Sequence, residues 1–78
     1  MLYNERVREL REDNRYTQKD MGALLNVGQR TYSDYESGRI RIPVDCLIIL
    51  AKFYNVSMDY ICGVTDVRGK FPQEREKR

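Results

Sequence analysis

The strongest constraint on the fold of this chain is a pair of helical segments within residues 17–38 that only three residues separate. The first helix has a clear start, because Thr17 and Asp20 have the spacing of a capping box, in which each side chain bonds the other residue's backbone N–H group. It is expected to end at Asn26, a residue type that tolerates the left-handed backbone conformation. Gly38 suits the end of the second helix for the same reason. Two helices with so short a connector must pack directly against each other.

The side chains of this segment fit such a pair. Gly22 is small at the point where the second helix must cross closely over the first. The positions expected to face the core are all apolar or aromatic: Met21, Leu25, Val27, Tyr32 and Tyr35. Residues 18–38 are therefore predicted to form two helices joined by a tight turn, a unit that places its second helix in the major groove of DNA.

Three further helices are expected around this unit. The first runs from about Asn4, its N-cap, to Asp13, and another opens at Pro43, which suits a first helical turn. Residues 55–57, Asn-Val-Ser, repeat the helix-ending and helix-starting pattern of residues 26–28, Asn-Val-Gly, and predict a short helix over residues 58–62.

No segment alternates as a β-strand would. We therefore predict an all-α fold: a compact five-helix domain over residues 1–63, followed by a charged tail, residues 64–78, that is solvated or frayed.

Composition limits the class of protein. The 78 residues suffice for one domain, and 41% hydrophobic with 33% charged residues is typical of a soluble globular chain. The longest apolar run, residues 46–51, is too short to cross a bilayer and no signal peptide opens the chain, so we expect a cytoplasmic protein with no membrane partner. The net charge is only +2, and residues 1–63 carry nine basic and nine acidic side chains, so a basic surface must arise from where the charges lie.

Catalytic and metal-binding motifs are absent from the sequence. There is no histidine and no glycine-rich phosphate loop. Cys46 and Cys62 cannot supply the roughly four ligands of a zinc site. They are either a disulfide or two buried thiols, and a reducing cytosol favours the thiols. We therefore expect no enzyme, no metal and no cofactor.

The chain resembles the lambda-repressor/Cro-type (XRE) family of helix-turn-helix proteins. The matching residues span most of the chain: Arg6-Val7-Arg8-Glu9-Leu10-Arg11, Thr17-Gln18, Glu36-Ser37-Gly38, Pro43, Leu50-Ala51 and Val56-Ser57-Met58-Asp59. The resemblance implies a lambda-repressor-like DNA-binding domain and a sequence-specific regulator of transcription, most simply a repressor that occupies a promoter. The sequence departs from the family at Asn26, Gly28 and Tyr32, and the bulk of Tyr32 could tilt the recognition helix.

The family fold implies which side chains meet the bases. The recognition helix should present Gln29, Arg30, Ser33 and Asp34 outward. Gln29 can bond an adenine edge, and Arg30 a guanine edge or a phosphate. Asp34 can accept from a cytosine amino group, repel wrong sequences, or orient Arg30.

The backbone of the DNA is expected to meet side chains that flank the motif. Gln18 resembles a family glutamine that touches a phosphate and braces the recognition helix. The expected phosphate contacts are Arg15, Thr17, Gln18, Lys19, Arg39 and Arg41. Arg11 and Glu36 match a family pair that forms a structural salt bridge.

A domain of this size reads only a few base pairs, so we expect a homodimer, at least on DNA, that binds an inverted-repeat operator. The side chains with apolar surface to spare for a dimer contact are Ile48, Ile49, Tyr60 and Val64, although a wide core could bury the two isoleucines. An antitoxin or another protein-interaction module on the same fold, with a toxin or regulatory protein as partner, is the alternative.

Overall fold

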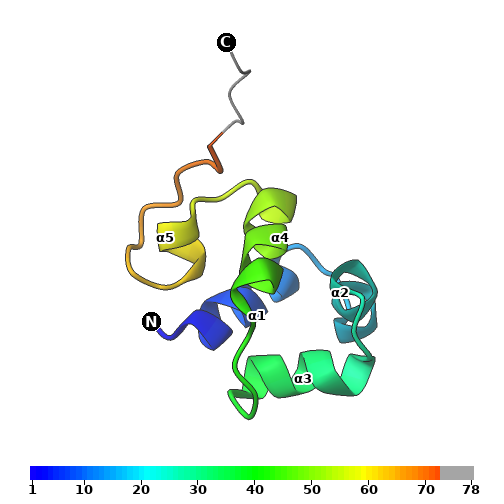
Figure 1. The fold of residues 1–78 in the computed structure, drawn as a ribbon. Helices are drawn as coiled ribbons and strands as arrows, with labels where there is room; N and C mark the ends of the chain where they lie inside the picture. Colours follow the sequence, from blue (N-terminus) through cyan, green and yellow to red (C-terminus); the bar gives the residue numbers. More distant parts are fainter. Residues whose placement is uncertain (73–78) are drawn as a thin grey trace.

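The structure, a computed structural model, describes residues 1–72, which hold five helices and no strand. The helices are α1 (Tyr3–Asp13), α2 (Gln18–Leu25), α3 (Gln29–Ser37), α4 (Val44–Tyr54) and α5 (Met58–Ile61). Figure 1 shows α2 and α3 together at one end of the domain, with α5 and the N-terminus at the other and α1 and α4 between them. The predicted all-α, five-helix architecture is confirmed.

Local side-chain and backbone signals set most helix ends. Thr17 Oγ1 accepts the N–H of Asp20 at 3.0 Å, and Asp20 Oδ2 accepts the N–H of Thr17 at 2.9 Å, which completes the predicted capping box. Asn26 and Asn55 end α2 and α4 in the left-handed conformation, with φ of 59° and 54°. Gly38 ends α3 in the same way.

Three predicted helix ends differ from the observed ones by one or two residues. Helix α1 begins at Tyr3 rather than after Asn4, because the backbone N–H of Leu2 is capped by Glu5 Oε1 at 3.1 Å. The Asn4 side chain bonds the carbonyl of Glu36 on α3 instead. Pro43 is the N-cap of α4 rather than its first residue, and α5 ends at Ile61, one residue before the predicted end.

The core forms from the inward stripes of the helices. Its most completely buried apolar side chains are Val7, Leu10, Met21, Tyr32, Leu50, Ala51, Val56 and Ile61. Cys46 is buried and Cys62 half-buried, and both are free thiols whose pKa burial raises, so neither is a reactive thiolate near neutral pH. No helix within residues 1–72 has the length and apolar character needed to span a membrane.

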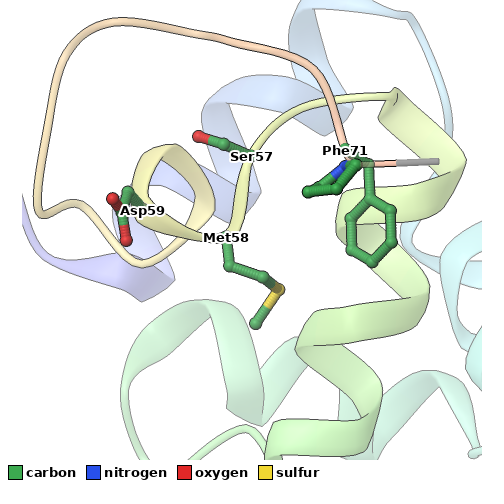
Figure 2. A pocket seen from close by; sticks show the side chains of 5 residues that line it. Ser57, Met58, Asp59 and Phe71 are labelled. Atoms are coloured by element: carbon green, nitrogen blue, oxygen red, sulfur yellow. The ribbon is translucent and has the colours of Figure 1, made fainter. Parts of the chain in front are cut away.

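The described part of the C-terminal tail is solvated but not frayed. The N–H of Ser57 donates to the carbonyl of Arg68 at 3.0 Å, and the N–H of Phe71 donates to Asn55 Oδ1 at 3.3 Å. The tail therefore turns back along α5. Figure 2 shows the side chains of Met58 and Phe71 beside one small hollow that this return creates. The remainder of the predicted tail, residues 73–78, lies outside the described residues.

Candidate nucleic-acid interface

The turn between α2 and α3 depends on a close approach at Gly22. A Cβ atom on this residue would lie 3.1 Å from the carbonyl oxygen of Val27 and 3.4 Å from that of Gly28. The N–H of Val27 donates to the carbonyl of Gly22 at 2.9 Å, which holds the turn against α2. Helix α3 thus leaves α2 in a direction that the backbone itself sets, as Figure 1 shows.

Helix α3 has a buried face and an exposed face. Tyr32 and Tyr35 are buried and meet edge to face, with ring centroids 6.4 Å apart. The core therefore accommodates the bulk of Tyr32, and burial together with the nearby Glu36 carboxylate raises the pKa of its hydroxyl. Gln29 and Arg30 are exposed at the start of α3, while Ser33 is half-buried. These three candidate base contacts are brought together on one short helix.

Asp34 lies between two arginines rather than free on the surface. Its Oδ1 atom is 4.0 Å from Arg30 Nε and 3.7 Å from Arg39 Nε. Its backbone carbonyl accepts the N–H groups of Arg39 and Ile40 at 3.0 and 3.2 Å, so the loop after α3 folds back over this residue. Asp34 is thus paired with both arginines, and it lies nearer to Arg39 than to Arg30.

A buried carboxylate joins α1, α2 and α3. Glu36 Oε2 lies 2.7 Å from Arg11 Nε, and Glu36 Oε1 lies 3.0 Å from Arg11 Nη2 and 3.2 Å from Gln18 Nε2. Burial alone would raise the pKa of Glu36, but the hydrogen bonds from Arg11 and Gln18 outweigh it and hold the pKa below its ordinary value. Glu36 is therefore ionised at neutral pH, and it holds the Gln18 side chain at the first turn of α2.

The candidate phosphate contacts lie in three places. Arg15, with a φ of 62°, occupies the connector before α2. Thr17 is the N-cap of α2, and Gln18 and Lys19 are its first two residues. Arg39 and Arg41 are exposed in the loop after α3. The Thr17 hydroxyl is already engaged as the cap of α2, whereas Gln18 keeps one amide N–H beyond its bond to Glu36.

Sequence reasoning assigned no separate role to Arg8 and Ser37. The structure brings both to a polar recess between α1 and α3, together with Arg11, Gln18, Ser33 and Glu36. The i, i+3 spacing of the two arginines on α1 and the i, i+4 spacing of the two serines on α3 were visible signals. The meeting of the two helix faces was not, because it depends on tertiary packing.

The four candidate dimer contacts differ in how far they are exposed. Val64 is 76% exposed and Ile49 38% exposed, whereas Ile48 is half-buried. Tyr60 is buried, and the Arg6 guanidinium lies 3.8 Å above its ring, so it belongs to the core rather than to an exposed contact surface.

Comparison with known proteins locates this arrangement among transcriptional regulators. The family model described as helix-turn-helix matches residues 7–61. Two HTH-type transcriptional regulators of Bacillus subtilis are each 37% identical to the chain: the uncharacterized YobD over 83% of the chain and 58% of its own length, and ImmR over 90% and 55%. The chain thus spans little more than half the length of these relatives.

Two solved structures share the fold at 26% identity. A transcriptional regulator from Listeria innocua superposes with a TM-score of 0.75, covering 97% of this chain and 64% of the other. The P22 c2 repressor, solved in complex with a synthetic operator, superposes with a TM-score of 0.69, covering 78% of this chain and 92% of the other.

Proposed function

The chain belongs to the helix-turn-helix family of DNA-binding proteins, and from this we propose that it binds double-stranded DNA sequence-specifically and regulates transcription. The observation that carries the proposal is the exposed start of α3, where Gln29 and Arg30 stand on a helix that Gly22 and Glu36 hold in one orientation. Its output is occupancy of a promoter, as a repressor. The P22 c2 repressor, which shares the fold, was solved on an operator.

In the proposed complex, α3 lies in the major groove with its N-terminal turn against the bases. Gln29 bonds an adenine edge through its amide, and Arg30 bonds a guanine edge or the adjacent phosphate. Asp34 orients Arg30 through their i, i+4 contact, and Ser33 contributes a hydroxyl at the edge of the groove. The DNA backbone is held by the cations that flank the motif, Arg15, Lys19, Arg39 and Arg41, and by Thr17 and Gln18 at the start of α2.

A selection of binding sites from random duplexes, followed by affinity measurements on the selected site, tests this proposal. Gln29→Ala and Arg30→Ala should each weaken specific binding by about 1–3 kcal/mol. Gln29→Ala should leave nonspecific binding nearly unchanged, whereas Arg30→Ala should weaken it too if the side chain touches phosphate. Lys52→Ala, an exposed change on α4, is the control. If both α3 variants bind the selected site as tightly as the parent, the recognition surface lies elsewhere.

We further propose that two copies bind an inverted repeat, because one recognition helix cannot select a single site in a genome. Twofold symmetry would put the half-sites about 34–36 Å apart. Ile49 and Val64 are the exposed apolar candidates for the contact between copies, with the half-buried Ile48 beside them. Sedimentation of the protein alone and on the selected duplex measures the stoichiometry. One protomer on an asymmetric site would exclude the dimer.

A further inference from the structure

A polar recess of about 220 Å³ lies between α1 and α3, beside the first turn of α2. Its walls carry Arg8, Arg11, Gln18, Ser33, Glu36 and Ser37. We propose that this recess binds one phosphate of the DNA backbone, that Arg8 supplies the principal charge, and that Glu12 competes with the phosphate for Arg8. The inference rests on the proposed function and adds a contact to it.

The recess has hydrogen-bond donors that the protein leaves available. The Arg8 side chain is 62% exposed, and only its Nε atom has a partner among residues 1–72, Glu12 Oε2 at 3.2 Å. Both terminal nitrogens of its guanidinium therefore face solvent, and a planar fork of this kind bonds phosphate oxygens in pairs. Gln18 adds its second amide N–H, since only the first is bonded to Glu36.

The acidic groups near the recess do not exclude an anion. Glu36 lies in its wall, but Arg11 and Gln18 occupy both of its oxygens and its side chain is 4% exposed. Glu12 is the other carboxylate beside the cations, 3.2 Å from Arg8 Nε and 3.9 Å from Arg11 Nη2. It is half exposed, and an exposed pair of this kind is weak, so a phosphate can displace it.

The position of the recess suits a backbone phosphate. Gln29, Ser33 and Ser37 follow one another at four-residue intervals, so they share one face of α3. The start of this row is the proposed base-reading end, and its other two members line the recess. A duplex whose major groove holds the start of α3 therefore brings a phosphate strand along this row toward Arg8.

The test measures how the affinity for the selected duplex depends on salt. Arg8→Ala should reduce the slope of log affinity against log salt by about 1, the value for one lost phosphate contact. Arg68→Ala, which removes an exposed arginine from the C-terminal segment, should keep the parent slope. Glu12→Gln should tighten binding at low salt several-fold, and this gain should vanish in the Arg8→Ala, Glu12→Gln double variant. Ethylation of the contacted phosphate should weaken the parent more than Arg8→Ala, which keeps only the Gln18 bond to that phosphate.

The outcomes separate this inference from the proposed function. A parent protein that binds no duplex overturns both. A parent that binds its selected site, with Arg8→Ala matching it in slope and in ethylation pattern, overturns the phosphate recess alone. Arg8→Lys keeps the charge and should keep the slope, so a loss of slope in Arg8→Lys as large as in Arg8→Ala would also count against the contact. Thermal unfolding of each variant verifies that the fold is intact.

Discussion

Two arginines of α1 anchor this helix toward opposite ends of the domain, and they use different chemistry. Arg11 faces α3 and makes two bonds to the carboxylate of Glu36, at 2.7 and 3.0 Å. Arg6 faces α5, where Nη1 donates to the carbonyl of Tyr60 at 3.0 Å and the guanidinium lies 3.8 Å above the Tyr60 ring. Its nearest carboxylate, Asp66, lies 2.9 Å from Nη2 but is 94% exposed.

The difference shows that a buried cation does not need a buried anion. At the α3 end, both charges are withdrawn from water, so each depends on the other. At the α5 end, the cation is satisfied by a carbonyl dipole and an aromatic face, and the exposed carboxylate adds little. The first anchor should therefore fail when either partner is removed, and the second only when the arginine is removed.

Glu36→Ala should have the largest effect on stability. It leaves the half-buried Arg11 guanidinium without its counter-charge, and breaking a buried pair from one side costs about 3–5 kcal/mol of unfolding free energy. Urea unfolding followed by circular dichroism measures the loss. Glu12→Ala, which removes an exposed carboxylate from the same arginine, is the matched control and should stay near the parent. Equal losses in the two variants would contradict the assignment.

Arg6→Ala should rank next, with a loss of about 2–3 kcal/mol, because it removes charge-assisted bonds to backbone carbonyls and the stacking on Tyr60. Arg6→Lys restores the charge without the planar fork and should recover only part of this loss. The same urea experiment applies. A full recovery in Arg6→Lys would mean that charge alone maintains this anchor.

The α3 anchor should also respond to acid. The pKa of Glu36 in the folded protein lies below its ordinary value of 4.5, so its stabilisation is present above that value and is lost as the pH falls through the lower, folded-state pKa. The parent should therefore lose its stability advantage over Glu36→Gln as the pH is lowered from neutral. The pKa of Asp20 is lowered as well, chiefly by its bond from the Thr17 N–H, but this contribution is common to both proteins. An advantage that does not change with pH would mean that Glu36 contributes through shape rather than charge.

Asp66→Asn should have the smallest effect, about 0–1 kcal/mol, since the carboxylate is exposed and the arginine retains its other partners. Thermal unfolding of the parent and of Asp66→Asn at low and high salt measures this effect. The difference in stability between the two proteins should shrink at high salt, because salt screens the ion pair. A loss as large as that of Arg6→Ala would show that both anchors depend on paired charges, and would remove the contrast between them.

The sequence predicted what short-range contacts determine. The capping box of Thr17 and the left-handed ends at Asn26 and Asn55 each involve residues within one turn, and all three were predictable. The close approach at Gly22 was also predictable, because so short a connector forces the two helices to cross near a small residue. These signals sufficed for the order of the helices and for the exposed start of α3, Gln29 and Arg30, whereas Ser33 and Asp34 are less exposed than predicted.

Long-range contacts were not predictable in the same way. The pairing of Arg11 with Glu36 was expected only through the family resemblance. No local pattern marks Arg6 as buried, since its bonds to Tyr60, Thr65 and Asp66 span 54 to 60 residues. The helix start at Tyr3 shifted because Asn4 found a partner on α3 rather than capping α1. The return of the tail along α5 likewise depends on a backbone hydrogen bond, between Ser57 and Arg68, that residue types do not predict.

The bond from Arg6 to Tyr60 spans 54 residues, and this length has a consequence for folding kinetics. Closing so long a loop loses more chain entropy than closing the short turn between α2 and α3. We expect α2 and α3 to associate early, the two ends of the domain to join last, and that joint to open first in the native state. Amide hydrogen exchange should then be faster in α5 than in α2 and α3, and uniform rates would contradict this order. The contact between α1 and α5 would then open transiently while α2 and α3, which carry the proposed recognition surface, stayed packed together.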